Sequence, residues 1–270
     1  MNKAVIYVPS YKRAMRLLTR INTLQWISPE WKKKTYLVVR EEEIGSYEKV
    51  AGLYGVNLIF IPSSAYENKS FFGWGDTMDW IINYAIERNE RFIIMDDDLK
   101  LSYRPELTEK KWLPMNNEHF EEGIDKLLTT TYDIPYMGWR ERQYSDKHIT
   151  EYEDNARFIH VFGFYSEFFK NNSKFRYRNS EQKFMTDFRM LLTLLTNGVR
   201  TRAWMRYCHD DIPDAEGGCS VMRTVEEYNQ SAITLCRDFP DIVTLRQKTN
   251  WNDVRLSPTI HWKRAFKGEQ

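Results

Sequence analysis

Three consecutive carboxylates, Asp96-Asp97-Asp98, are the residues whose types and spacing point most directly to chemistry. They follow residues 91–95, a hydrophobic run that predicts a buried β-strand, so they stand where that strand ends. In open α/β sheets, ligands bind beyond the carboxyl ends of the strands. Neighbouring carboxylates repel one another, and a divalent cation with a preference for oxygen ligands, Mg²⁺ or Mn²⁺, relieves that repulsion. The pattern therefore predicts a metal and diphosphate site rather than a solvated acidic turn.

A second candidate site follows the first predicted strand, residues 4–8. The motif Pro9-Ser10-Tyr11-Lys12-Arg13 is expected in the same crevice as the acidic triplet. The ring of Tyr11 can stack on a nucleobase, and Arg13 near a helix start can bind a phosphate. The alternative is an ordinary strand-to-helix turn with an arginine on the surface. Pro9, Tyr11 and Arg13 are thus candidates for binding a nucleotide.

The sequence Gly73-Trp74-Gly75-Asp76-Thr77 lies at the start of the helix that leads into the triplet. Paired glycines allow a backbone to approach a ligand closely, which makes Gly75 a candidate nucleotide contact. Asp76 acting only as a helix cap is the alternative interpretation. The spacing matches neither a Rossmann fingerprint nor a P-loop.

Three further candidates lie in the second half of the chain. Asp187 opens a strongly apolar helix, residues 186–196, and is either a favourable N-terminal residue or a general base aimed into the crevice. Glu181 is the next candidate for the base. His209 follows a predicted strand, residues 200–207, and stands among acids, so it is a candidate third ligand of the metal.

The elements that must position these residues alternate regularly up to about residue 100. Short apolar strands and amphipathic helices follow one another, which is typical of βαβ units and a doubly wound, mostly parallel α/β sheet. Beyond residue 100 the alternation is less regular. The expected strands are residues 4–8, 35–40, 57–61, 91–95, 158–164 and 200–207, and the expected helices are 13–26, 42–54, 75–90, 117–130, 186–196 and 225–239.

The composition narrows the class of protein. With 270 residues and 42% hydrophobic residues, the chain can form a sizeable core and is not a disordered protein. Its net charge of +1 neither requires nor excludes a nucleic-acid partner. Cys208, Cys219 and Cys236 have no CxxC spacing, which disfavours a disulfide scaffold or zinc site and fits a reducing compartment. No segment has the length of a signal peptide or membrane span, so a cytoplasmic protein without a membrane or stable protein partner is expected.

Taken together, these residues resemble a GT-A glycosyltransferase, and more narrowly the TET/JBP-associated glycosyltransferases of tailed phages. The resemblance covers residues 5 to about 240. The segments that carry it are Val8-Pro9-Ser10-Tyr11-Lys12-Arg13-Ala14, Ile94-Met95-Asp96-Asp97-Asp98, Thr186-Asp187, His209, and Gly217-Gly218 with Arg223. Thr186 departs from the pattern, because a second acid often precedes the base in GT-A enzymes.

This resemblance implies one domain over residues 1–270, with a nucleotide-sugar half (about 1–100) and an acceptor half (about 101–270). It implies transfer of a sugar from a nucleotide-sugar, probably a UDP-sugar, to a hydroxymethylated pyrimidine of phage DNA in the host cytoplasm. Asp96 and Asp98 would hold Mg²⁺ or Mn²⁺ with His209, and Asp97 would reach the sugar or ribose. Asp187 would act as the base, which a configuration-retaining reaction does not require.

A DNA acceptor requires positively charged contacts, and Lys174, Arg176 and Arg178 alternate with Phe175 and Tyr177. This alternation predicts either a phosphate-binding edge or a solvated strand with one buried face. Two other functions remain open: a GT-A enzyme acting on a glycan, lipid or protein, and a nucleic-acid-binding module without catalysis.

Overall fold

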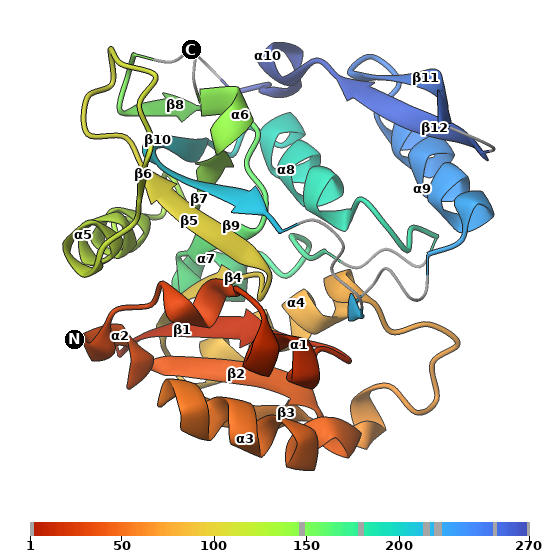
Figure 1. Ribbon diagram of the computed structural model, residues 1–270. Coiled ribbons are helices and arrows are strands. Elements are labelled where there is room, and N and C mark those ends of the chain that lie inside the picture. The colour runs from red at the N-terminus through yellow and green to blue at the C-terminus, as the bar shows by residue number, and fades with distance from the viewer. Residues whose placement is uncertain are drawn as a thin grey trace.

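The computed structural model describes residues 3–145, 149–177, 181–212, 217–218, 223–250 and 253–268 (Figure 1). Within these residues, a ten-stranded sheet has the order β3-β2-β1-β4-β9-β7-β10-β5-β6, with β8 paired to β10. Its strands are β1 (Ala4–Pro9), β2 (Thr35–Arg40), β3 (Asn57–Ile61), β4 (Arg91–Met95), β5 (Leu99–Tyr103), β6 (Leu113–Pro114), β7 (Tyr136–Glu141), β8 (Tyr152–Asp154), β9 (Val161–Phe164) and β10 (Thr201–Asp211). A separate hairpin pairs β11 (Val243–Asn250) with β12 (Asp253–Ile260).

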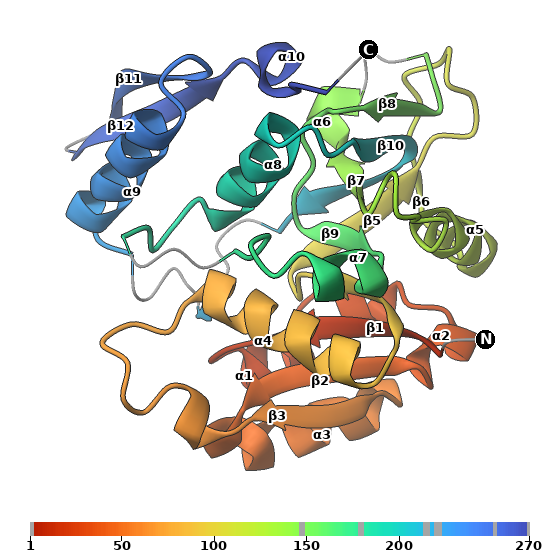
Figure 2. The same cartoon turned by 180° about the vertical axis from the view of Figure 1, so that it is seen from behind.

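Helices lie on both faces of this sheet, as Figures 1 and 2 show from opposite sides. They are α1 (Ala14–Thr19), α2 (Pro29–Lys32), α3 (Ile44–Tyr54), α4 (Trp74–Glu87), α5 (Asn117–Leu127), α6 (Arg142–Ser145), α7 (Ser166–Asn171), α8 (Thr186–Thr196), α9 (Val225–Asp238) and α10 (Trp262–Ala265), with 3₁₀ turns at Thr23–Gln25, Glu41–Glu43 and Ser63–Ala65. No helix of the described segments is both long and apolar enough to cross a membrane.

The first half of the sheet is parallel and contains a change of direction. The chain passes from β1 outward to β2 and β3, then returns to place β4 on the other side of β1. Such a switch point opens a crevice between the carboxyl ends of the two strands that diverge from it. Here those ends carry the motif at residues 9–13 and the acidic triplet.

The second half of the sheet is mixed. β9 runs antiparallel to β4 and β7, while β10 is parallel to β7 and antiparallel to β5. In the first pairing, Met95 lies opposite Val161, so the start of β9 adjoins the end of β4. The predicted α/β class with a largely parallel sheet is confirmed, and the antiparallel strands account for the loss of regular alternation after residue 100.

Alternate side chains of the central strands enter two cores. Ile6 and Val8 face α1, α3 and α5, whereas Val5 and Tyr7 face α4, α7 and α8. Since successive side chains of a strand point to opposite faces, a strand buried on both sides is apolar throughout, as β1 is. Strands β2, β3 and β4 and helix α8 have the predicted bounds.

The predicted helix over residues 13–26 is wrong in its second half. Helix α1 ends at Thr19, and the side-chain amide of Asn22 donates to the carbonyls of Leu17 (2.9 Å) and Arg20 (3.0 Å). These carbonyls would otherwise accept bonds from a continuing helix. The chain then turns so that Thr23 Oγ1 donates to the Asp96 carbonyl (2.5 Å) and accepts from the Leu99 amide (2.9 Å). Thr23 thus fixes the backbone on both sides of the acidic triplet.

Candidate active site

A cavity of about 430 Å³ opens at the carboxyl ends of β1, β2 and β4. The N-terminal turns of α4 and α8 and the end of β10 complete its wall. The lining includes nearly all the side chains predicted to act together: Pro9, Tyr11, Arg13, Asp96, Asp97, Asp98 and Asp187. The switch point of the sheet therefore brings together residues that are up to 178 positions apart in the sequence.

Arg13 is held by two members of the triplet. Its Nη1 lies 2.5 Å from Asp97 Oδ1 and 2.9 Å from Asp98 Oδ2. Asp97 is only 2% exposed and also accepts a hydrogen bond from Ser10. The carboxylate of Asp97 and the guanidinium of Arg13 thus neutralise each other, instead of projecting toward a ribose and a phosphate as the sequence suggests.

One arginine does not neutralise the whole triplet. Burial and repulsion from Asp97 raise the pKa of Asp98 to about 6, although Arg13 opposes the shift. Burial likewise raises the pKa of Asp97 despite its ion pair. Additional positive charge near Asp98 would therefore stabilise the ionised site.

Asp96 is bound on both of its oxygens. Oδ1 accepts from the indole of Trp74 at 3.1 Å, and Oδ2 lies 2.5 Å from Nδ1 of His160. The other ring nitrogen of His160 lies 3.3 Å from Asp211 at the end of β10. Burial lowers the pKa of His160, but its hydrogen bonds to Asp211 and Asp96 outweigh this effect and raise the pKa well above its usual value. The imidazolium therefore bridges two cavity-lining carboxylates.

His209 does not have the position expected of a metal ligand facing the crevice. Strand β10 continues to Asp211, so His209 lies inside the strand opposite Leu101, not beyond its end. Its side chain is fully buried, outside the cavity lining, and its ring centroid is 5.3 Å from that of His160. Burial lowers the pKa of His209 to about 3, which keeps the ring neutral. The cavity-lining residue at this end of β10 is Asp211.

The two candidate bases have different environments. Asp187 lies in the first turn of α8 and lines the cavity, and burial raises the pKa of its carboxyl group. Glu181 is exposed, pairs with Arg237 at 2.6 Å and lies outside the lining. Of the two, Asp187 has the access that proton transfer within the cavity requires.

Gly75 supports the cavity without lining it. A Cβ at this position would lie 3.0 Å from Oγ1 of Thr186, so the glycine allows the first turns of α4 and α8 to pack closely. This packing fixes Asp187, which follows Thr186. Neighbouring Asp76 accepts from the Gly73 amide at 3.1 Å, as expected of a residue near a helix N-terminus.

Tyr11 and Gly218, in the loop after β10, also line the cavity. The guanidinium of Arg40, at the end of β2, lies 3.8 Å from the centroid of the Tyr11 ring. The Gly218 amide donates to the Tyr11 carbonyl at 2.8 Å, and Gly217 and Gly218 have φ angles of 87° and 64°. A Cβ on Gly218 would lie 2.8 Å from Nη2 of Arg13, so the close approach of this loop requires glycine.

Sequence reasoning missed His160, Arg40 and Asp211. Arg40 and Asp211 end strands, and strand ends in α/β sheets are a usable signal. His160 has no local signal, because it reaches Asp96 only through the pairing of β9 with β4.

The predicted basic strand over Lys174–Arg178 is wrong for its described residues, 174–177, which form no strand. Phe175 and Tyr177 both enter the core while Lys174 is exposed and Arg176 half-buried, so one side of the segment is buried as predicted although it is not a strand. Arg176 donates to the carbonyls of Phe169 (3.2 Å) and Phe175 (2.8 Å), and Lys174 donates to Asn197 (2.9 Å). These bases are engaged within the protein, and Arg178 lies outside the described residues.

Comparison with solved structures identifies the fold. The chain is similar to glucosyl-3-phosphoglycerate synthase from Mycobacterium tuberculosis, solved in complex with Mn²⁺, UDP and glucosyl-3-phosphoglycerate (TM-score 0.51, 8% identity, covering 96% of this chain and 87% of that one). It is similar to the same extent to a mycobacterial protein (TM-score 0.51, 8% identity, 96% and 84% covered). The fold is that of the GT-A glycosyltransferases.

The family is shown by sequence. The family model described as TET-Associated Glycosyltransferase matches residues 4–213. The chain belongs to this family and is a glycosyltransferase, as the resemblance implied. A search of the curated proteins finds no match.

Proposed function

We propose that this glycosyltransferase moves a sugar from a UDP-sugar to the hydroxyl of a 5-hydroxymethylpyrimidine in DNA, with the aid of Mn²⁺ or Mg²⁺. The observation that carries the donor half of the proposal is the cavity itself. It combines a carboxylate cluster, an aromatic ring beside an arginine, and a buried carboxylate at a helix N-terminus. The similar mycobacterial synthase binds UDP and Mn²⁺, which supports this donor and metal.

The chemistry of the donor set fits a divalent cation. Asp96, Asp98 and Asp211 line the cavity with carboxylate oxygens, the ligands that Mg²⁺ and Mn²⁺ prefer. Within the described residues no three such side chains already have the arrangement of a metal site, and His160 lies between Asp96 and Asp211. We assign the ion to Asp96 and Asp98, with Asp211 in the role that the sequence suggested for His209. When bound, the ion supplies Lewis-acid stabilisation of the leaving diphosphate.

Each remaining residue has a role that its position supports. Tyr11, which lines the cavity beside Arg40, offers its ring to the base of the nucleotide, and Pro9 shapes the turn that presents it. Arg13 keeps Asp97 and Asp98 ionised and close together. Asp187 removes the proton of the acceptor hydroxyl as that oxygen attacks the anomeric carbon. The bond between this carbon and the diphosphate breaks, and the diphosphate leaves with the bonding electrons. This base is required only if the reaction inverts configuration.

The proposal of a DNA acceptor is supported by the family to which the chain belongs, the TET-associated glycosyltransferases. A hydroxymethyl group at position 5 of a pyrimidine projects into the major groove of DNA, where its hydroxyl is accessible to an enzyme.

The raised pKa of Asp187 brings the base closer to the operating pH, which favours proton transfer.

The test is transfer to duplex oligonucleotides that contain hydroxymethylcytosine, hydroxymethyluracil or the unmodified bases. Each is incubated with a panel of UDP-sugars and Mn²⁺, and the mass of the DNA is measured. We expect an increase by one sugar on modified DNA only. Asp98→Ala should abolish the increase, whereas Asp241→Ala, which removes an exposed acid, should leave it unchanged. Hydrolysis of the UDP-sugar without transfer to any DNA would reject DNA as the acceptor and favour a glycan, lipid or protein.

A further inference from the structure

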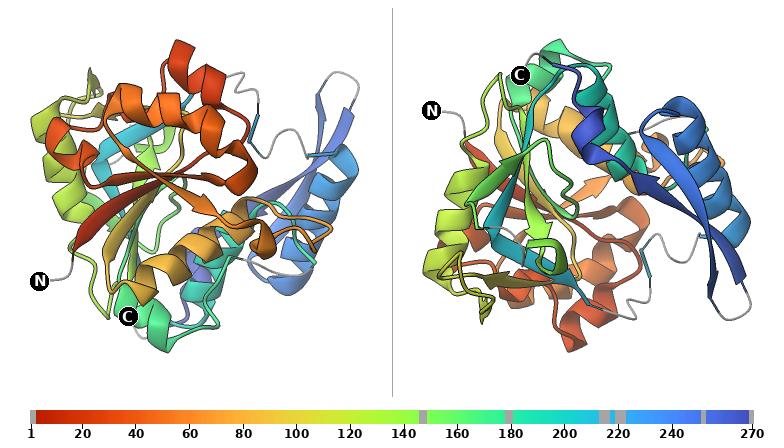
Figure 3. Two further views of the ribbon diagram at one scale, coloured as in Figure 1. Left: turned by 90° about the horizontal axis from the view of Figure 1, so that it is seen from below. Right: turned by 90° about the horizontal axis from the view of Figure 1, so that it is seen from above.

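The C-terminal hairpin of β11 and β12 lies beyond the residues that the family model matches, 4–213. It packs against α9, and Figure 3 shows the two projecting together beside the main sheet. A third core attaches this unit to α8, with Leu192 and Leu195 of α8, Leu235 of α9 and Val243 of β11. Helix α8 carries Asp187 in its first turn, and Arg223, just before α9, lines the cavity. The hairpin is therefore joined to the active site through two helices.

The two faces of the hairpin differ in chemistry. Val243 lies opposite Ile260, and Leu245 opposite Pro258, on the face that packs on α9 and the third core. The side chain of Asn229, on α9, forms hydrogen bonds with the backbone of β12 at Val254 (3.2 Å) and Leu256 (2.7 Å). Because side chains alternate across a strand, the residues between these positions point away from α9.

The outward face is basic. Arg246 lies opposite Ser257, and Lys248 lies directly opposite Arg255. All three cations are exposed, and Arg246 and Lys248 make no ion pair with any described residue. From residue 243 to 268 the sequence has one acid, Asp253, and six bases: Arg246, Lys248, Arg255, Lys263, Arg264 and Lys267.

We infer that this outward face binds duplex DNA and holds it across the active site. The inference rests on the proposed DNA acceptor. A two-stranded β-ribbon fits the major groove, which is also where the hydroxymethyl group projects. Each strand has eight residues. At about 3.3 Å per residue this gives a ribbon about 26 Å long, enough to follow several base pairs. Arg246, Lys248 and Arg255 contact phosphates, and the hydroxyls of Thr244, Ser257 and Thr259 on the same face can donate to them.

The experiment compares the salt dependence of duplex DNA binding for the wild type and Arg246→Ala/Lys248→Ala/Arg255→Ala. Each lost phosphate contact reduces the slope of log affinity against log salt by about 0.9, so the variant should lose about 2.7. Between 50 and 200 mM salt, the wild-type affinity should therefore fall about 40-fold more than that of the variant. UDP binding with Mn²⁺, measured by calorimetry, should be the same for both proteins.

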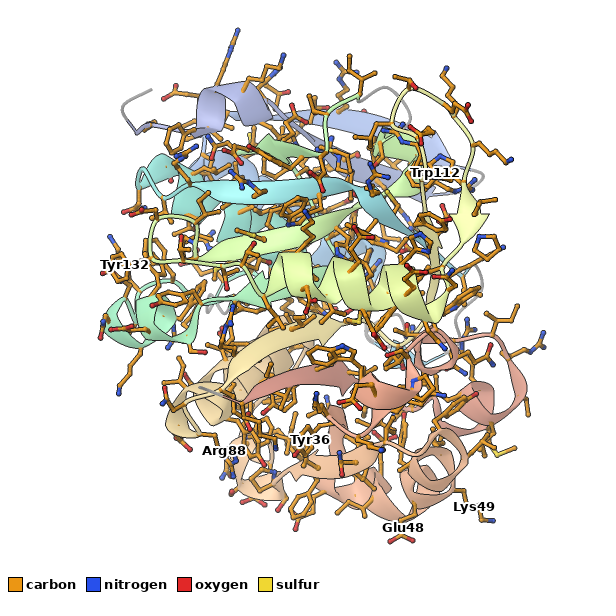
Figure 4. All side chains as sticks on the ribbon, turned by 90° about the vertical axis from the view of Figure 1, so that its left-hand side faces the viewer. Tyr36, Glu48, Lys49, Arg88, Trp112 and Tyr132 are labelled. Atoms are coloured by element: carbon orange, nitrogen blue, oxygen red, sulfur yellow. The ribbon has the colours of Figure 1, made fainter. Side chains whose placement is uncertain are left out.

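A charge-matched control removes three exposed lysines outside the hairpin, Lys33→Ala/Lys49→Ala/Lys170→Ala. Lys49 lies on α3 at the far lower end of the molecule in Figure 4. This control should keep the wild-type slope. The single variants Arg246→Gln and Lys248→Gln should each reduce the slope by about 0.9. They replace the triple variant in the experiment if that variant does not fold.

The outcomes separate the two proposals. If the triple and single hairpin variants keep the wild-type slope while the wild type still glycosylates DNA, the hairpin proposal is wrong and the acceptor stands. If the wild type neither binds nor modifies duplex DNA but binds UDP, both fail. Binding of the wild type to anionic lipid vesicles but not to DNA would also overturn the hairpin proposal.

Discussion

Replacing Arg13 with glutamine should destabilise the folded protein more than the same replacement of an exposed arginine. Arg13 is 12% exposed, and its Nη1 contacts Asp97 and Asp98, of which Asp97 is 2% exposed. Glutamine keeps a polar side chain but removes the positive charge. Among the residues that the structure describes, Ser10 is then the side chain that still donates a hydrogen bond to the Asp97 carboxylate. The variant thus leaves a buried carboxylate without a counter-charge.

The distances give the scale of the effect. At an effective dielectric constant of about 20, unit charges separated by 2.5 Å attract by about 7 kcal/mol, and those separated by 2.9 Å by about 6 kcal/mol. The cost of desolvating the ions offsets most of this attraction in the intact protein. Removing one partner of a buried pair typically costs about 3–5 kcal/mol, because the remaining charge stays desolvated. We expect Arg13→Gln to lower the free energy of unfolding by that amount, out of a total that is about 5–15 kcal/mol for ordinary proteins.

The assay is urea unfolding followed by tryptophan fluorescence, with a chelator present so that no metal compensates for the lost charge. Arg20→Gln is the matched control, since Arg20 is exposed at the end of α1, and it should change stability by about 0.5 kcal/mol at most. Adding Asp97→Asn to Arg13→Gln should restore at least about 2 kcal/mol, because the unpaired charge is then absent. A loss below about 1 kcal/mol for Arg13→Gln, or no recovery in the double variant, would refute this account of the triplet.

Three further results are expected. Asp187→Asn should reduce kcat about 10²–10⁴-fold with little change in UDP binding, whereas Glu181→Gln should leave both unchanged; a normal kcat for Asp187→Asn would indicate another base or a retaining reaction. Burial raises the pKa of Asp187, and a general base must be ionised to act. In a pH–rate profile, kcat of the wild type should therefore rise with pH through that raised pKa and then level off. The rise should be missing in Asp187→Asn. Gly163→Ala in β9 should lower the free energy of unfolding, measured with denaturant, by about 1–3 kcal/mol, because the new Cβ would lie 2.6 Å from the Leu127 carbonyl oxygen. Gly52→Ala in α3 should raise it by about 0.5–1 kcal/mol, because no atom lies within 4 Å of the new Cβ.

The local sequence was sufficient to predict the bounds of an element where that element is buried on both faces or has a clear end. Strands β2, β3 and β4 are apolar runs bounded by charged residues or proline, and helix α8 ends at Asn197-Gly198 with Gly198 at a φ of 75°. The alternation of these strands with helices determined the parallel half of the sheet. Since parallel strands align their carboxyl ends, the acidic triplet and the motif at residues 9–13 were expected to share one crevice, and they do.

Other features depended on contacts between distant segments. Helix α1 stops early because Asn22 binds its last carbonyls and Thr23 binds the backbone of the triplet. Strand β10 extends to Asp211 because its last residues pair with β5, which buries His209 in the sheet. Arg176 looked available for phosphates but bonds to nearby carbonyls. Thr23 and Asp96 are 73 residues apart in the sequence, and β10 and β5 come from different halves of the chain, so no local pattern reveals these two contacts.

The sequence by itself determined which residue types are present for the chemistry and which strands carry them to one edge of the sheet. Only the tertiary structure decided how their charges are paired. Arg13 turns inward to Asp97 because burial makes an unpaired carboxylate costly, and His160 reaches Asp96 because β9 pairs antiparallel with β4. The basic face of the C-terminal hairpin likewise follows from its register, which places three cations on the side that α9 leaves exposed. Hydrophobic periodicity is a local property of the chain, whereas the pairing of charges depends on which segments the fold brings into contact.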